Sequence, residues 1–322
     1  MSQMTYSEAI VSAICEEMRS DPRVVVMGQD VELFMTDAKT RQELGPARIR
    51  NTPISEAGFI GAGIGAALTG LRPVIELGCS TFLYSAMDQV VNQAAKSRYM
   101  FGGQANIPLV IRAPVIYAMA AAAHHSDRPW GLFAQAPGLK IVVPTNPSDA
   151  KGLMKSAIRD GNPVIFFEDA SIAEQRGEVP EREYAIPIGI ADIKRVGCDV
   201  TIAALAGGVH QTLEAARALQ DEGVSAEVID VRTVVPLDRA TILESVAKTR
   251  HLVVVDPAPG MCSVASELAA TVAQHGFYSL KSPIVRITAP DVPVPFSPAL
   301  ERSMFPTAAK IVTAVREMCL RS

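Results

Sequence analysis

Residues 137–168 read "PGLKIVVPTNPSDAKGLMKSAIRDGNPVIFFE". Their pattern predicts a strand, a helix and a second strand. The runs "LKIVVPT" and "PVIFFE" are short, apolar and rich in β-branched or aromatic residues, whereas "SDAKGLMKSAIRD" between them has helical periodicity. Parallel strands need a long crossover connection, which is usually a helix. This stretch therefore predicts a parallel sheet of the α/β class.

The same alternation continues on both sides of this stretch. Earlier in the chain, apolar runs at 23–28, 73–78 and 108–114 predict strands, and residues 88–100 predict a helix. Such alternation is typical of a parallel sheet with helices on both faces. Residues 169–193 are polar and contain prolines without a sustained period, which is typical of a linker.

Beyond the linker the chain starts a second series of three strand–helix units and a closing strand. We therefore predict two domains, at 1–170 and 194–322, joined by a linker at 171–193. The strands of the second series are expected in "DVTIAALA", "SAEVIDVRT", "HLVVVD" and "PIVRITAP", and its helices in "GVHQTLEAARALQDEG", "PLDRATILESVAKT" and "SVASELAATVAQHG".

Composition excludes several classes of protein. A formal net charge of −4, with Lys and Arg scattered singly, gives no basic field for nucleic acid. No run reaches the roughly 18 apolar residues of a membrane span, and Glu8, Glu16 and Glu17 interrupt the apolar pattern of the N-terminus. We therefore expect neither membrane insertion nor a signal peptide. Five cysteines, never spaced as CxxC, predict reduced packing thiols and a cytoplasmic location.

Residues 51–70, "NTPISEAGFIGAGIGAALTG", contain five glycines and a single charge, on Glu56. The glycines are no dinucleotide fingerprint, because that motif needs a strand directly before it, whereas Pro53 and a helix-capping Ser55 stand here. Two interpretations stay open. Either the glycines pack a buried helix closely and Glu56 favours its positive end, or Glu56 is an acid held in apolar surroundings for proton chemistry. The close-packing positions would be Gly58, Gly61, Gly65 and Gly70.

The chain also contains, in this order, "TYSEAI", "VVVMGQDV", "NTPISEAGFIGAGIGAALTGLRPVIE", "AMDQVVNQAAKSRYMFGGQ", "HHSD", "DVRTVVPLD" and "PDVPVPFSPALE". With these segments it resembles, nearly end to end, the beta subunit of the thiamine-diphosphate-dependent decarboxylase (first) component of 2-oxo acid dehydrogenase complexes, the group serving pyruvate, branched-chain 2-oxo acids and acetoin. The resemblance implies a pyrimidine-binding α/β domain followed by a transketolase C-terminal α/β domain. It also implies an oxidoreductase that decarboxylates a 2-oxo acid and transfers the acyl group to lipoamide of an acyltransferase partner.

The resemblance assigns roles to four side chains. The acid of the "TPISE" motif, here Glu56, hydrogen-bonds the aminopyrimidine of the cofactor and favours its imino tautomer, and Ile54 of the same motif lies at the cofactor. Phe82, in "CSTFLYSAMDQ", stacks on the aminopyrimidine; without the resemblance we would place it in the core. His125, in "AAAAHHSDRPW", assists acyl transfer. Two adjacent histidines would otherwise indicate surface groups, because they are too few for a zinc site.

The resemblance further implies metal ions. In the segment "SAIRDGN", together with an earlier strand, the main-chain oxygens of Leu109, Ala157, Ile158, Asp160 and Asn162 would hold a structural monovalent cation such as K⁺.

Half of the cofactor site is missing. Enzymes of this kind hold the diphosphate through Mg²⁺ on a GDG motif, an oxygen-rich site, and this sequence has no GDG. The resemblance therefore implies a chain that is active only with an alpha subunit, which supplies the Mg²⁺ ligands, in an α2β2 heterotetramer.

Several departures from the family pattern fall around the expected substrate side of the cofactor pocket. The family's glycine-rich loop is replaced by "ELFMTDAKTRQEL" at 32–44, and a second glycine-rich run by "VIYAMAAAA" at 115–123. Asp127 and Gln135 stand where the family has Gln and His, and residues 253–264 lack its usual acid and paired glycines. We infer retained cofactor chemistry with an altered acyl donor or acceptor. The alternative is a split transketolase-like carboligase with an alpha partner, and an intact Glu56 argues against a non-catalytic subunit.

Overall fold

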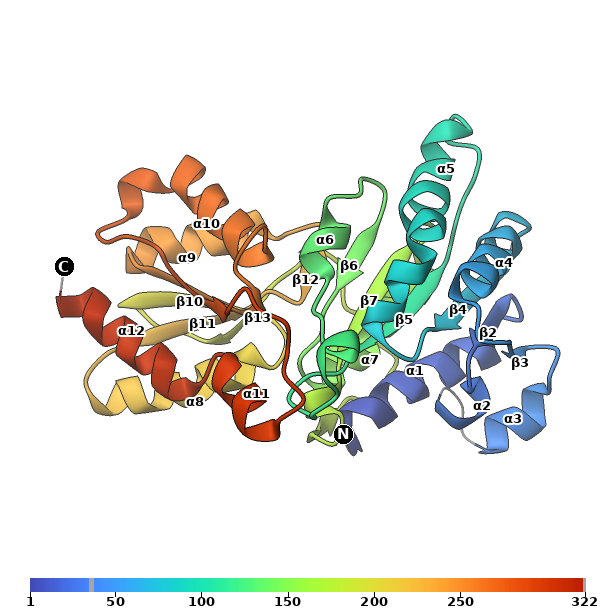
Figure 1. Ribbon diagram of the computed structural model, residues 1–322, viewed down its shortest axis with the longest axis horizontal. Coiled ribbons are helices and arrows are strands. Elements are labelled where there is room, and N and C mark those ends of the chain that lie inside the picture. Colours follow the sequence, from blue (N-terminus) through green and yellow to red (C-terminus); the bar gives the residue numbers. More distant parts are fainter. Residues whose placement is uncertain (35–37, 321–322) are drawn as a thin grey trace. The chain divides into compact units, whose positions relative to one another are not determined.

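A computed structural model describes residues 1–34 and 38–320 of the chain (Figure 1). None of the helices in these ranges is long and apolar enough to cross a lipid bilayer. By their internal contacts the residues form two compact units. The first unit consists of Met1–Tyr117 and Phe133–Ile188, and the second of Ala118–Leu132 and Gly189–Ser322.

Six parallel strands form the sheet of the first unit, in the order β6-β7-β5-β4-β2-β3. In β5 and β7, for example, Val110 lies opposite Val164. The predicted parallel sheet is confirmed, and β3 adds a strand too short for a sequence pattern to reveal. The strands are β2 (Val24–Gly28), β3 (Ile49–Asn51), β4 (Arg72–Glu76), β5 (Val110–Val115), β6 (Lys140–Val142) and β7 (Val164–Asp169).

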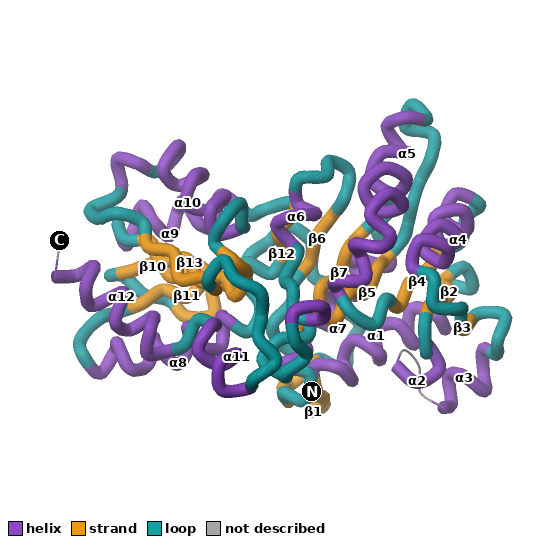
Figure 2. Tube along the Cα trace, in the orientation of Figure 1, coloured by secondary structure: helices purple, strands orange, loops and turns teal. Residues whose placement is uncertain are grey.

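Helices cover both faces of this sheet, as predicted (Figures 1 and 2). Val74 and Ile75 are consecutive in β4 and so point to opposite faces. Val74 belongs to a core cluster with Ile10 of α1 and Leu153 of α7, whereas Ile75 lies against Gly63 of α4. The helices of this unit are α1 (Tyr6–Ser20), α2 (Val31–Phe34), α3 (Ala38–Leu44), α4 (Glu56–Leu68), a π-helix (Gln89–Ala94), α5 (Ala95–Met100) and α7 (Pro147–Arg159).

The glycines of α4 differ from the close-packing set expected from the sequence. Another element comes closer at Gly63, where a Cβ would lie 2.7 Å from the Ile75 side chain, than at the expected Gly61, where a Cβ would lie 3.4 Å from the Gln89 side chain. Around Gly65 and Gly70 no described atom would lie within 4 Å of an added Cβ. Gly70 instead follows the end of the helix with a φ of +100°, which favours glycine. The expected side-chain cap at Ser55 was also wrong, since Ser55 occupies the N-cap without a capping hydrogen bond.

The second unit has a five-stranded sheet in the order β14-β13-β10-β11-β9. Its first four strands are parallel, and β9 is an antiparallel edge strand. Helices α8 and α12 pack in one core cluster on one face, and α9 and α10 lie on the other (Figure 1). The elements are α6 (Trp130–Ala134, which begins in this unit), β9 (Asp192–Arg195), β10 (Val200–Ala204), α8 (Gly208–Asp221), β11 (Ala226–Asp230), β12 (Thr233–Val235), α9 (Arg239–Thr249), β13 (Leu252–Pro259), α10 (Val264–His275), β14 (Val285–Ala289), α11 (Pro298–Met304) and α12 (Ala308–Leu320).

The stretch without a sequence period, residues 169–193, contains short strands paired with distant partners. β8 (Arg176–Val179) pairs antiparallel with β1 (Ser2–Thr5), and β9 pairs with β11. In the unusual stretch 32–44, helices α2 and α3 are described, and residues 35–37 lie outside the described residues.

All five cysteines are free thiols, but the expectation that they are all packing residues was wrong. Cys15 and Cys79 are buried, whereas Cys198, Cys262 and Cys319 are exposed.

Candidate active site

Glu56 is the first residue of α4, and its carboxylate is held by two neighbours from other elements. Gln29 Nε2 donates to Glu56 Oε1 at 3.2 Å, and Ser85 Oγ donates to Glu56 Oε2 at 3.2 Å. Gln29 directly follows β2, so it stands at the carboxyl end of the sheet, where parallel α/β sheets bind ligands. The half-buried carboxylate is therefore oriented at the edge where a ligand is expected.

Phe82 lies in the 3₁₀ helix Ser80–Ala86, which follows β4 by way of a tight turn. Gly78 makes this turn with a φ of +80°, and its N–H donates to Glu76 Oε1 at 2.8 Å. The half-buried Phe82 ring lies next to this turn, since a Cβ on Gly78 would be in ordinary van der Waals contact with it at 3.9 Å. Ser85 Oγ also lies 2.8 Å from the Phe82 main-chain oxygen, so its single proton is shared between this oxygen and Glu56.

The residues of the "TPISE" motif offer further groups to a ligand. Thr52 Oγ1 is buried and has no hydrogen-bond partner in the part of the chain that the structure describes. Ile54 is 82% exposed and presents an apolar surface. An oriented carboxylate, a half-buried aromatic ring, an exposed aliphatic side chain and an unsatisfied hydroxyl fit a cofactor that carries an aromatic, hydrogen-bonding ring.

His125 lies in a different unit from these three side chains. It ends the 3₁₀ turn Ala123–His125 and is exposed, on the segment Ala118–Leu132 that packs with the second unit. The structure thus brings Glu56 and Phe82 together, with Ile54 in the same motif, and places His125 on its own segment.

The alanine run before His125 keeps a glycine-like backbone. Ala118, Ala120 and Ala122 have φ values of +59°, +56° and +61°. Residues with a Cβ rarely adopt such values. Glycine would adopt the backbone of this alanine run with less strain.

Four of the five main-chain oxygens expected at the monovalent cation already accept hydrogen bonds. Arg72 Nη1 donates to the oxygens of Ile158 and Asp160 at 2.8 and 3.0 Å. The oxygens of Ala157 and Leu109 accept from the N–H groups of Asp160 and Val164 at 3.3 and 2.8 Å. A carbonyl oxygen has two lone pairs, so each keeps one for a further ligand. The oxygens suit a hard cation, although the Arg72 guanidinium already supplies positive charge at two of them.

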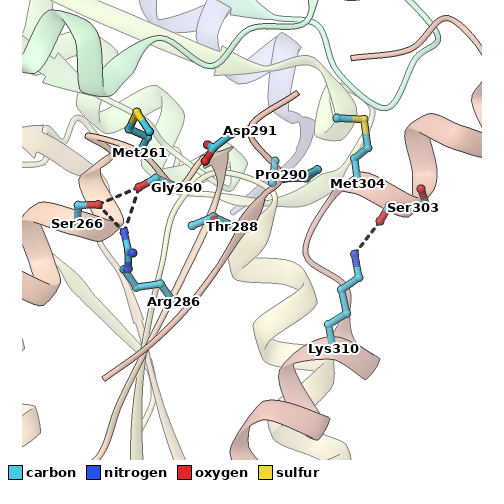
Figure 3. A pocket seen from close by; sticks show the side chains of 11 residues that line it. Gly260, Met261, Ser266, Arg286, Thr288, Pro290, Asp291, Ser303, Met304 and Lys310 are labelled. Carbon is cyan, nitrogen blue, oxygen red and sulfur yellow. Dashed lines mark hydrogen bonds between the residues drawn. The ribbon is translucent and has the colours of Figure 1, made fainter. Parts of the chain in front are cut away.

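A groove of about 740 Å³ in the second unit contains none of the side chains discussed so far (Figure 3). Arg286 Nη1 donates to the Gly260 oxygen and to Ser266 Oγ, and Lys310 Nζ donates to the Ser303 oxygen at 2.7 Å. Figure 3 shows these two cations on separate walls, each turned toward its own protein acceptor.

Sequence reasoning missed Gln29 and Ser85, the two partners of Glu56. Gln29 carried a usable signal, because it is the first polar residue after an apolar strand of a parallel sheet. Ser85 carried none, since its approach to Glu56 depends on the path of the 3₁₀ helix.

Comparisons with known proteins cover the chain almost completely. The transketolase pyrimidine-binding domain matches residues 2–174, and the transketolase C-terminal domain matches residues 189–311. The acetoin:2,6-dichlorophenolindophenol oxidoreductase subunit beta of Bacillus subtilis is 47% identical over 98% of this chain and 97% of its own. The pyruvate dehydrogenase E1 component subunit beta of Rhizobium meliloti is 42% identical over 100% of this chain and 71% of its own.

A solved structure supports the fold. A split gene transketolase, described as an inactive beta4 tetramer, matches with a TM-score of 0.80 and 24% identity over 98% of each chain. The fold, the two matched domains and the near full-length identities agree. The chain therefore belongs to the transketolase-like family of beta subunits from the thiamine-diphosphate-dependent E1 components of 2-oxo acid dehydrogenase complexes.

Proposed function

We propose that this chain is the beta subunit of a 2-oxo acid decarboxylase that transfers the acyl product to lipoamide of an acyltransferase partner. The observation that carries the proposal is the Glu56 carboxylate, held between Gln29 and Ser85 beside Phe82 at the carboxyl edge of the sheet. Identities of 40–47% over nearly the whole chain favour this function over a carboligase, because the split transketolase relative shows the fold alone.

The side chains of the first unit have separate tasks in this proposal. Glu56 holds a proton against the aminopyrimidine nitrogen, with its two oxygens oriented by Gln29 and Ser85. Phe82 offers a ring face to the aminopyrimidine, and Ile54 covers it on the apolar side. Bound thiamine diphosphate supplies the electron sink for decarboxylation. The protein supplies orientation and a positioned acid.

Acyl transfer is the proposed task of His125. An exposed imidazole on a held segment suits proton transfer to an incoming acceptor, which has to reach the site from solvent. Asp127 and Gln135, the two departures from the family pattern, are half-buried and exposed, respectively. In this proposal these two side chains adjust which acceptor is accommodated.

The remaining cofactor ligands belong to a partner in this proposal. An alpha subunit would supply the Mg²⁺ ligands for the diphosphate, and two copies of each chain would form an α2β2 heterotetramer. K⁺ would be bound by the main-chain oxygens of Leu109, Ala157, Ile158, Asp160 and Asn162. We further propose a cytoplasmic location, supported by the five free thiols, and a functional division into domains at 1–170 and 194–322.

The experiment that tests the function uses the chain assembled with its alpha partner. The assembled enzyme is given a panel of 2-oxo acids with an artificial electron acceptor, then with a free lipoyl domain, and then with aldehydes. Decarboxylation coupled to acylation of the lipoyl domain is expected. Decarboxylation that joins the product to aldehydes and never acylates a lipoyl domain from the same organism would replace the proposal with the carboligase.

A further inference from the structure

The segment that carries His125 is fastened at both ends to buried carboxylates of the second unit. Near its start, the Ala120 N–H donates to Glu301 Oε2 at 2.7 Å. At its end, Trp130 Nε1 donates to Asp256 Oδ1 at 3.2 Å. Glu301 is 1% exposed and Asp256 is fully buried. A hydrogen bond to a buried carboxylate is stronger than one between neutral groups, so both ends are firmly held.

Between these two attachments, other contacts hold the segment. The Arg128 guanidinium lies 4.8 Å from the centroid of the Phe305 ring, and it also donates to the Ser126 main-chain oxygen. Ser126 Oγ donates to the Ala122 oxygen at 2.7 Å, which closes the turn around His125. At the far end, a Cβ on Gly131 would lie 3.1 Å from the Cys262 oxygen.

The backbone around the first attachment is strained, and this strain gives the Glu301 hydrogen bond its importance. Ala118, Ala120 and Ala122 all have positive φ, and Ala122 combines a φ of 61° with a ψ of −175°, a region that essentially glycine alone occupies. Such a conformation persists only where its surroundings enforce it. The Glu301 hydrogen bond reaches the middle one of the three strained residues.

Each of the two acids has one carboxylate oxygen without a hydrogen-bond partner in the part of the chain that the structure describes. These buried oxygens are Glu301 Oε1 and Asp256 Oδ2. Burying a carboxylate with one oxygen unsatisfied is costly, and a neutral residue at either position would avoid that cost. The buried charge is therefore kept at a cost in stability, although Asp256 Oδ1 also accepts from the Ala258 N–H at 2.9 Å.

We propose that Glu301 and Asp256 are positioning residues for His125: they hold the strained segment 118–132, through the Ala120 N–H and the Trp130 indole, in the conformation that aims the imidazole. The proposal rests on the function proposed above for His125. Neither acid touches the reacting groups in this account.

The first test measures amide hydrogen exchange of peptides covering 118–132 in the full chain assembled with its alpha partner. Glu301→Ala removes the acceptor and should speed exchange there by at least 10-fold, whereas Glu301→Gln keeps an acceptor oxygen and should restore most of the protection. Trp130→Phe keeps an aromatic ring and removes the donor, and it should also speed exchange. The matched control is Glu267→Ala, which removes an exposed carboxylate paired with Arg239 in the same unit. Unchanged exchange in both Glu301→Ala and Trp130→Phe would overturn the anchoring.

The second test asks whether the anchors act through His125. Glu301→Ala should slow acylation of the lipoyl domain about 10- to 100-fold, in kcat more than in KM, and leave decarboxylation with an artificial acceptor nearly unchanged. In a protein that already carries His125→Ala, Glu301→Ala should slow acylation of the lipoyl domain by less than a further 2-fold. Equal losses in both backgrounds would mean a general structural role and overturn the positioning.

The two tests also distinguish a failure of this positioning role from a failure of the function proposed for the enzyme. A wild-type enzyme that never acylates a lipoyl domain refutes the proposed function, and the exchange measurement still decides whether the acids hold the segment. Where Glu301→Ala does not fold, Trp130→Phe carries both tests, because an indole-to-phenyl change leaves the buried carboxylates in place.

Discussion

Glu56 and Phe82 are connected through one hydroxyl group: Ser85 Oγ lies 3.2 Å from Glu56 Oε2 and 2.8 Å from the Phe82 main-chain oxygen. The carboxylate and the aromatic residue come from different elements, α4 and the 3₁₀ helix after β4, so this hydroxyl sets their relative position. Gln29 fixes the second oxygen of the same carboxylate. Orientation of the acid is therefore built into the first unit itself.

The first prediction concerns the acid. Glu56→Gln keeps the size and an acceptor oxygen but cannot hold or release a proton, so turnover of the assembled enzyme should fall by roughly 10²–10⁴-fold. Folding should be preserved, because the residue is half-buried and its partners remain. Hydrogen–deuterium exchange at the reactive carbon of the cofactor isolates the activating step. An unchanged exchange rate in this variant would show that another group activates the cofactor.

A matched variant separates the acid from its orientation. Ser85→Ala leaves the carboxylate and removes the bridging hydroxyl. Turnover of the assembled enzyme should therefore fall only about 10-fold or less, in line with the roughly 1 kcal/mol net value of one hydrogen bond. A loss from Ser85→Ala as large as that from Glu56→Gln would mean that the hydroxyl has a chemical role of its own.

The second prediction concerns assembly. Because the chain lacks a GDG motif, the isolated chain should bind thiamine diphosphate negligibly, and mixing with the alpha partner should restore Mg²⁺-dependent binding. Titration calorimetry on the purified chain, alone and in the mixture, measures this directly. Tight binding by the chain alone would contradict a cofactor site shared between two subunits.

The sequence predicted the parts of the fold that rest on local periodicity. The βαβ unit at 137–168 predicted the parallel sheet because strand and helix periods are encoded locally. β1 pairs with β8 across more than 170 residues in four-residue strands, so no local pattern could reveal the pair. The close approach at Gly63 was missed for a similar reason, since it depends on which face of α4 meets Ile75.

The candidate site divides in the same way. Glu56 stood out as a lone charge among glycines, and Phe82 and His125 were assigned by the family resemblance. Asp256 was noted in the sequence only as part of a segment that departs from the family. Its hydrogen bond to Trp130 joins residues 126 positions apart, and such contacts follow from tertiary packing alone.

The third prediction concerns pH and Asp256. Burial raises the pKa of Asp256 from its ordinary value of 3.8 to about 6, with Arg128 and the surrounding N–H groups opposing the rise. An acid whose pKa is raised in the folded state binds more protons when folded. The destabilisation caused by its buried charge is therefore absent below the unfolded pKa, grows between about pH 4 and pH 6, and is complete above the folded pKa.

Asp256→Asn keeps an acceptor for Trp130 and carries no charge. Its free energy of unfolding relative to the wild type should therefore increase by about 2 kcal/mol from pH 4 to pH 7. Urea unfolding across this range measures the difference. If the difference in the free energy of unfolding between the two proteins stays constant with pH, Asp256 has its ordinary pKa in the folded protein.

The fourth prediction concerns the alanine run before His125. Ala122 has a φ of 61° and a ψ of −175°, so its Cβ is strained, and Ala122→Gly should relieve about 1–3 kcal/mol of that strain. Glycine also loses more backbone entropy on folding, about 0.4–1 kcal/mol, so the net stabilisation should be about 1 kcal/mol. Ala121→Gly is the matched control: Ala121 does not have a positive φ, so glycine there should destabilise by its entropy alone. Denaturant unfolding of both variants measures the contrast, and equal destabilisation by both would mean that the alanine run is not strained.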